Sequence, residues 1–134
     1  MTAQRMLSTY RQTEVQSRTP LELVVMLYDG GLAFIHQARA AIERNDIAAR
    51  RDASTRALAV VSQLQSTLNM EAGGDVARQL DELYSWITGR ILAATMDNRV
   101  EPLDEAARVL AMLRDSWVTI ANGAADQQSV RGAA

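Results

Sequence analysis

Apolar residues recur at intervals of three and four along most of the chain, and this periodicity limits the folds open to it. No stretch alternates apolar and polar residues in the manner of a β-strand. The clearest run has the spacing of the buried seam of a left-handed helical bundle. Its members are Leu103, Ala106, Leu110, Leu113, Trp117 and Ile120. The chain is therefore expected to be all-α.

Start and stop signals divide the pattern into four long helices. Thr19 is a typical N-cap, and Pro20 behind it suits the first turn of a helix. Asp46 offers a second N-cap, and the adjacent glycines Gly73 and Gly74 predict a helix end. We expect helices over residues 20–44, 47–70, 75–98 and 102–122.

Short connections between long helices place neighbours antiparallel, which predicts an up-down four-helix bundle with a short N-terminal helical segment. A chain of 134 residues suffices for one domain with a single core. We expect a cap segment at residues 1–18 and the bundle at residues 19–122. Asn122 and Gly123 should end the last helix, leaving a disordered tail at residues 123–134.

Composition argues against several classes of function. The chain has no cysteine, which excludes disulfides and zinc–thiolate sites. Its 14 basic residues are offset by 16 acidic ones, so nucleic-acid binding is not expected. No apolar run reaches the ~18 residues of a membrane span, and no secretory signal precedes the bundle. We therefore expect a cytoplasmic protein without membrane insertion.

Catalytic equipment is not visible in the sequence, and we expect no enzyme activity, no cofactor and no metal. His36 is the only histidine, and Ala33 occupies the position where a di-metal bundle would carry glutamate. One alternative stays open. Histidine-phosphotransfer domains are also four-helix bundles, and His36 has Arg39 one turn later to stabilise a phosphoryl group.

The first helix carries more apolar surface than one core-facing stripe requires. Leu23, Leu27 and Phe34 lie off the core face, with Gly30 between them and Met26 beside them. A surface helix should be polar there. Either this helix is central and packs its second face on neighbouring helices, or that face is a groove; the sequence leaves both interpretations open.

The third and fourth helices show the same excess. Leu92 and Met96 point away from the core stripe, one turn beyond Gly89, and in the last helix Met112 and Val109 lie off or beside the seam. Since the opposite face already supplies a core, we expect exposed grooves. A groove that has glycine at its base and methionine along its sides can bind an amphipathic partner helix. The residues thus indicate a protein-binding module, with Gly30 and Gly89 allowing close backbone approach.

The segment before Thr19 carries a small apolar face. Met6, Leu7 and Tyr10 have the spacing of one helical turn within a polar stretch. So short a helix is marginal alone in water. We expect it to dock on an apolar part of the bundle; a frayed terminus is the alternative.

Several stretches together resemble the flagellar export chaperone FliS family. They are "LVVMLYDGGLAFI", "ALAVVSQLQSTLNMEAGGDVARQLDELYSWI" and "VLAMLRDSW", and the resemblance runs from Tyr10 to Trp117. The chain departs from the family at Thr95, where asparagine is common, at Arg99, where an acidic residue is common, and at Trp86, which replaces a tyrosine.

The resemblance implies a cytoplasmic four-helix bundle that binds newly made flagellin. Such chaperones hold the aggregation-prone C-terminal segment of flagellin in an extended, partly helical wrap, prevent premature polymerisation and deliver the subunit to the membrane export gate. They act without nucleotide or metal. The resemblance also implies that flagellin displaces the N-terminal segment and that Tyr10 contacts the export gate. Because the exposed apolar surface is wide, a homodimer of the client-free chain is expected.

Overall fold

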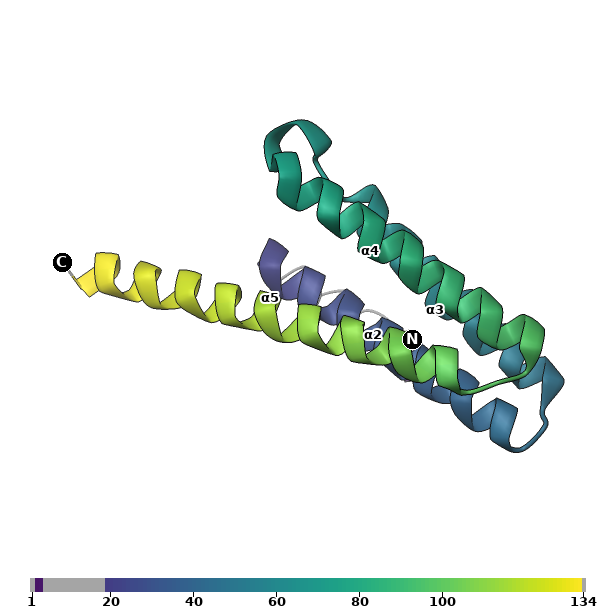
Figure 1. The fold of residues 1–134 in the computed structure, drawn as a ribbon. Coiled ribbons are helices and arrows are strands. Elements are labelled where there is room, and N and C mark those ends of the chain that lie inside the picture. The colour runs from purple at the N-terminus through teal and green to yellow at the C-terminus, as the bar shows by residue number, and fades with distance from the viewer. Residues whose placement is uncertain (1, 4–18, 134) are drawn as a thin grey trace.

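A computed structural model describes residues 2–3 and 19–133, with side chains described up to residue 123. Four long helices occupy residues 19–133 (Figure 1), and this part of the chain contains no strand. They are α2 (Pro20–Glu43), α3 (Ile47–Ser66), α4 (Met70–Asp97) and α5 (Glu101–Ala133). The predicted all-α four-helix fold is confirmed.

The first two helices begin where their caps predict. The Thr19 hydroxyl accepts a hydrogen bond of 3.2 Å from the backbone N–H of Glu22, and Pro20 occupies the first turn. Asp46 caps α3 by accepting a 3.0 Å bond from the backbone N–H of Ala49. Between the two helices, Asn45 adopts φ 56°, a left-handed conformation that asparagine tolerates better than most residues.

The predicted boundary between the second and third helices is right at Gly74 and wrong at the end of the second helix. The second helix ends at Ser66 rather than residue 70, and α4 begins at Met70 because Asn69 is its N-cap and accepts a 3.0 Å bond from the backbone N–H of Ala72. The glycine pair lies inside the first turns of α4. Gly74, at φ 53° and ψ −129°, is not helical and separates a short first turn from the continuous helix that follows, which begins near Asp75 as predicted.

The predicted end of the last helix is also wrong, because α5 continues through Asn122 and Gly123 to Ala133. A glycine costs a helix roughly 1 kcal/mol relative to alanine but does not oblige it to end. The division into a cap segment, a bundle and a tail stays a prediction, since residues 4–18 lie outside the described residues.

The helices form a ring in which α2 packs on α3 and α5, and α4 packs on the same two helices. Successive helices are antiparallel. We call the end with the α2–α3 and α4–α5 turns the closed end, and the end with the α3–α4 turn the open end. The α3–α4 pair and the α2–α5 pair diverge from the closed end toward the open end (Figure 1).

The core lies along the inner faces of all four helices. Its largest fully buried side chains are Tyr28, Tyr84, Ile35, Leu64, Ile87, Ile91, Leu103, Leu110 and Val61. The double glycine of α2 belongs partly to this packing. A Cβ added at Gly31 would lie 3.3 Å from Cγ1 of Val60 on α3, whereas one added at Gly30 would meet nothing within 4 Å. Only Gly31 is therefore needed for close approach of the bundle's own helices.

Candidate binding surface at the open end

A polar network forms the floor of the open end. The hydroxyls of Tyr28 on α2 and Tyr84 on α4 hydrogen-bond to each other, and the indole N–H of Trp117 on α5 donates a 3.1 Å bond to the Tyr28 hydroxyl. The two tyrosine rings lie 6.5 Å apart. Burial raises the pKa of both tyrosines above the usual value, so both are neutral near pH 7.

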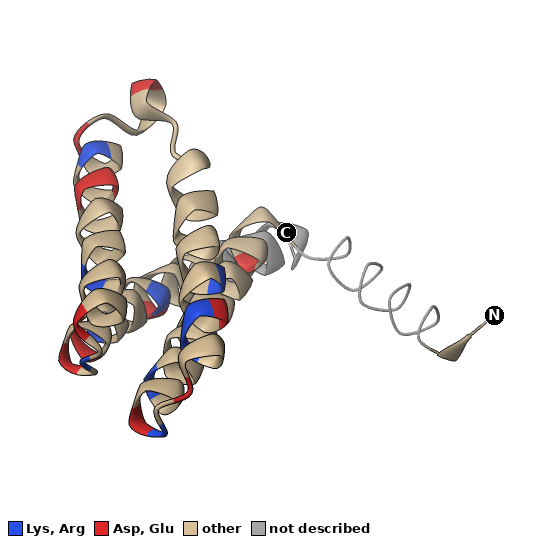
Figure 2. Ribbon diagram, turned by 90° about the vertical axis from the view of Figure 1, so that its right-hand side faces the viewer, with Lys and Arg blue, Asp and Glu red and all other residues tan. Residues whose placement is uncertain are grey.

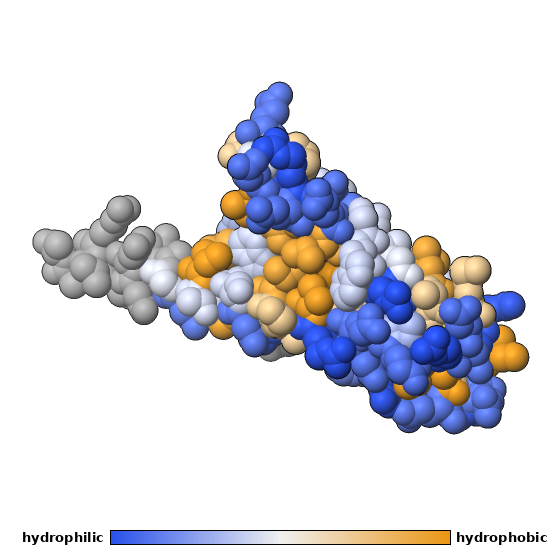
Figure 3. Space-filling model, viewed as in Figure 1, coloured by the Kyte–Doolittle hydropathy of each residue, from blue (hydrophilic) through white to orange (hydrophobic). Residues whose placement is uncertain are grey.

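Above this floor the diverging helices leave an apolar cavity of about 340 Å³. None of the described residues that line it is charged, and all four helices contribute to it. The lining residues are Pro20, Leu21, Val24, Leu64, Thr67, Leu68, Asn69, Gly73, Val76, Ala77, Leu80, Tyr84 and Trp117. Figure 3 shows apolar side chains gathered in the angle between α4 and α5.

A second apolar hollow of about 730 Å³ adjoins the cavity on the side of α2 and α3. It shares Pro20, Val24 and Thr67 with the cavity, so the two form one continuous surface. Its remaining lining residues are Leu23, Met26, Leu27 and Gln63. Because the described lining residues are mostly apolar and none is charged, this surface suits apolar side chains of a protein partner.

The predicted site residues of α2 divide between two places. Leu23 and Leu27 line the second hollow, which supports the groove interpretation for them. Leu27 and Phe34 are also half-buried against the core, as the alternative interpretation required. Phe34 does not line the open end; the Arg56 guanidinium lies 5.9 Å from its ring centre.

The predicted residues of α4 lie on its flank facing α3. Gln65 of α3 donates a 3.0 Å hydrogen bond to Ser85, which fixes that flank of α4 toward α3. Gly89, Leu92 and Met96 follow Ser85 at intervals of four, three and four residues and so continue along the same side. Leu92 is 44% exposed and Met96 82% exposed, as predicted.

The predicted residues of α5 lie on its flank facing α4. The Arg90–Glu105 ion pair of 3.3 Å joins these two helices. Val109 and Met112 follow Glu105 on the same side of α5. Met112 is 69% exposed, whereas Val109 is half-buried against the core. The structure therefore places the predicted residues on separate surfaces instead of one groove, and Met6, Leu7 and Tyr10 lie outside the described residues.

Several residues that line the open end were missed by the sequence analysis. Leu21, Val24 and Leu80 fall on the stripes that predict core positions. A helical wheel identifies the face on which a residue lies but not how far two helices diverge. The only signal for their role was their position toward the helix ends at the α3–α4 turn. Core-stripe residues there are open to a partner when the helices diverge.

Comparison with known proteins identifies the family. Residues 3–124 match the family of the flagellar protein FliS. The chain belongs to the FliS family. It is 30% identical over 119 residues to the flagellar secretion chaperone FliS of Salmonella typhimurium, covering 88% of each chain. It is also 30% identical to FliSB of Pseudomonas aeruginosa, covering 87% of this chain and 96% of that one.

The family motifs converge at the open end. The aromatic residues of "MLYDG", "LDELY" and "LRDSW" are Tyr28, Tyr84 and Trp117, which form the polar floor. The same motifs supply an ion pair of 2.7 Å between Asp29 on α2 and Arg114 on α5. In this member of the FliS family, the residues that carry the resemblance therefore hold α2, α4 and α5 together beneath the cavity.

The surroundings of His36 give the phosphotransfer alternative no support. It is exposed on α2, but Arg39 is already paired with Asp104, at 2.7 Å, and with Glu43. The hydrogen bond from Arg39 lowers the pKa of Asp104. Among the described residues no cluster of three metal-ligating side chains occurs, and no helix there is long and apolar enough to span a bilayer.

Proposed function

We propose that this protein is a cytoplasmic, non-enzymatic chaperone that binds the disordered C-terminal segment of flagellin. It prevents premature polymerisation of the subunit and supports its export through the flagellar secretion apparatus. Membership of the FliS family supports a role in flagellar export. The single observation that carries client binding is the uncharged apolar surface that the diverging helices leave at the open end.

The physics of the surface suits a disordered client. Folding a disordered segment on binding costs 2–5 kcal/mol or more, which the new interface must offset. At about 25 cal/mol per Å² of apolar area, about 200 Å² of buried surface offsets roughly 5 kcal/mol. An apolar partner helix can supply that area by placing side chains spaced three and four residues apart into the cavity and the adjoining hollow.

The remaining exposed apolar residues favour an extended client rather than a compact one. Leu92 and Met96 on α4, and Met112 on α5, lie on different flanks of the bundle. A segment that leaves the open end and continues along these flanks would cover them, consistent with a wrap. Until a client covers it, this surface is open to self-association, so we propose a homodimer of the free chain.

The N-terminal segment enters the proposal through its sequence. Met6, Leu7 and Tyr10 present one apolar turn, which we propose covers part of the client surface in the free protein. Displacement by flagellin would release this segment, and Tyr10 would then contact the membrane export-gate component.

Isothermal titration with flagellin tests the proposal. Full-length flagellin should bind the chaperone, and flagellin lacking its C-terminal segment should bind at least tenfold more weakly. The isolated C-terminal segment should recover most of the affinity. Undiminished binding of the truncated flagellin would show that the surface serves another partner or another part of flagellin.

A further inference from the structure

Arg50, at the closed end, is a part-buried cation without a carboxylate partner. Among the described residues, the ion pairs within 4.0 Å occupy seven arginines: Arg39, Arg44, Arg56, Arg78, Arg90, Arg99 and Arg114. Arg51 and Arg108 also make no such pair, but both are exposed. Among the arginines of the described residues, Arg50 alone is part-buried without an ion pair within 4.0 Å.

The hydrogen bonds of Arg50 are also incomplete. One Nη1 hydrogen is donated to the Oδ1 atom of Asn98, at 2.7 Å, and this acceptor is a neutral amide. The Nε atom is buried without an acceptor. A guanidinium has five N–H donors, and leaving a buried charged donor unpaired costs more than leaving a neutral one unpaired. The Nε of Arg90 is unpaired too, but Glu105 compensates its charge from 3.3 Å.

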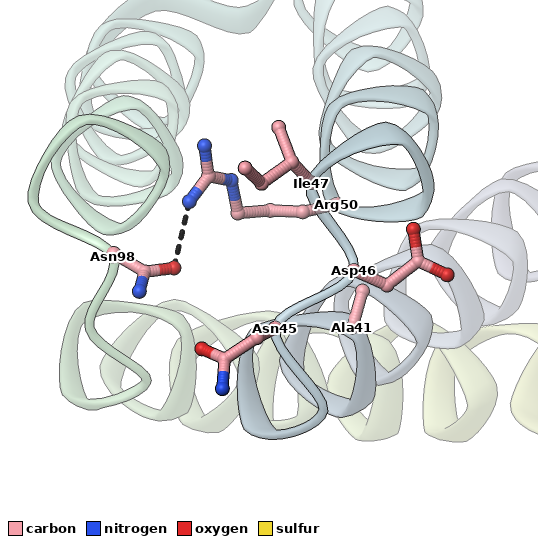
Figure 4. Close-up of a pocket in the computed structure, with 6 residues that line it drawn as sticks. All are labelled: Ala41, Asn45, Asp46, Ile47, Arg50 and Asn98. Carbon is pink, nitrogen blue, oxygen red and sulfur yellow. Dashed lines mark hydrogen bonds between the residues drawn. The ribbon is translucent and has the colours of Figure 1, made fainter.

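A pocket of about 180 Å³ lies against this guanidinium. Figure 4 shows Arg50 and Asn98 meeting across the pocket, with Ile47 beside Arg50 and Asp46 turned away from both. Asp46 is engaged elsewhere, because it caps α3 and lies 3.5 Å from Arg44. Ile47 is 57% exposed and offers an apolar contact beside the charge.

We propose that this closed-end pocket is a second protein-binding site, which takes a carboxylate side chain from an acidic segment of a partner on Arg50. The carboxylate accepts hydrogen bonds from the Nη groups of the guanidinium, since the Nε atom is buried, and apolar neighbours in the partner segment contact Ile47. Asp46 also lines the pocket, and its charge repels a singly charged carboxylate less than a dianion such as phosphate. Because the pocket lies at the opposite end from the cavity and the adjoining hollow, a partner can occupy it while a client fills these two.

A titration followed by NMR tests the site on the full ¹⁵N-labelled chain. The probe is the capped peptide Ac-Ala-Leu-Glu-Leu-Ala-NH2, and its control carries Gln in place of Glu. The Glu peptide should shift the Arg50 Nε–H, the Asn98 side-chain amide and the Ile47 backbone amide, with a Kd on the order of 1 mM, as one charge-assisted contact allows. The Gln peptide should bind at least tenfold more weakly.

Three variants separate a binding role from a structural one. Arg50→Gln should abolish the shifts, Arg50→Lys should retain them with reduced affinity, and Arg51→Gln, the exposed neighbour, should leave them unchanged. If Arg50→Gln unfolds the protein, the comparison of the two peptides on the natural chain still decides the question. Absence of these shifts, equal shifts with both peptides, or unchanged shifts in a folded Arg50→Gln would overturn the proposal.

Discussion

The Tyr28 hydroxyl lies where α2, α4 and α5 meet, and it has partners on both other helices. It hydrogen-bonds to Tyr84 and accepts from Trp117, while the Tyr28 side chain is fully buried. One hydroxyl thus satisfies two other polar groups next to an apolar cavity, where an unpaired group is costly.

Removing this hydroxyl should cost more than removing its neighbour's. Tyr28→Phe leaves the Tyr84 hydroxyl and the Trp117 N–H without their partner, so we expect a loss of about 2–3 kcal/mol in the free energy of unfolding. Tyr84→Phe should cost only about 1 kcal/mol, because Tyr28 keeps Trp117. Urea denaturation measures both. Equal losses would show that the Trp117 bond contributes nothing.

The same tyrosines predict alkaline sensitivity. Burial raises the pKa of Tyr28 and Tyr84 above the usual 10.0, so the folded protein holds both protons more tightly than the unfolded chain. Their contribution to stability is fully present below about pH 10 and falls as the pH rises further. The melting temperature should drop more steeply between pH 9 and 11 for the natural chain than for the Tyr28→Phe/Tyr84→Phe variant. If the melting temperatures of the two proteins fall in parallel with pH, the alkaline sensitivity does not come from these tyrosines.

The adjacent glycines of α2 should respond in opposite directions to alanine. Gly30→Ala adds a methyl group with no neighbour within 4 Å, and should raise the free energy of unfolding by up to about 1 kcal/mol. Gly31→Ala places its Cβ 3.3 Å from Val60 Cγ1, on a β-branched side chain with little rotamer freedom. Chemical denaturation should find it at least about 1 kcal/mol less stable than Gly30→Ala. Equal stabilities of the two variants would mean that α3 can move away from the added methyl group at little cost in free energy.

At the scale of the helices, the sequence predicted the features that depend on neighbouring residues, namely helix starts and the exposed face of a helix. Capping by Thr19 and Asp46 located the start of α2 and of α3, and off-seam positions such as Met96 are exposed as expected. The sequence analysis located the break at Gly74, but it missed the earlier end of α3 at Ser66 and the short turn that Asn69 caps ahead of that break. The open end could not be predicted, since helix divergence depends on packing between distant segments.

The exposed flank of α4 gives a test of binding without unfolding. Leu92→Asp and Met96→Asp place a charge on a solvated surface, so the melting temperature should stay within about 2 °C of the natural value while flagellin affinity falls. Leu110→Asp is the contrast, because Leu110 is fully buried on the seam and an unpaired charge there should unfold the bundle. Circular dichroism and titration with flagellin measure the two effects. If Leu92→Asp destabilises the fold as severely, this flank is structural.

The whole molecule has two ends of different character. Positions of acidic and basic residues lie near the turns of the closed end (Figure 2), whereas none of the described residues that line the cavity at the open end is charged. The α2–α5 and α3–α4 pairs converge at the first end and diverge at the second (Figure 1). One bundle can therefore hold an apolar client where its core is open and present a polar surface where its core is closed.

Hydrogen exchange with the flagellin C-terminal segment tests this division over the whole chain. At a free segment concentration of about 100 times Kd, binding should add about 2.7 kcal/mol to the free energy of unfolding. Amides that exchange through local openings, which cost less free energy than global unfolding, should exchange more slowly only where the bound segment packs. Protection from such openings should rise at the first turns of α2, the last turns of α3 and the first turns of α4. Amides around Ala41 and Asn45 should gain none beyond the global increase. Protection gained first at the closed end would place the client there, because a ligand slows local opening only where its own contacts must break.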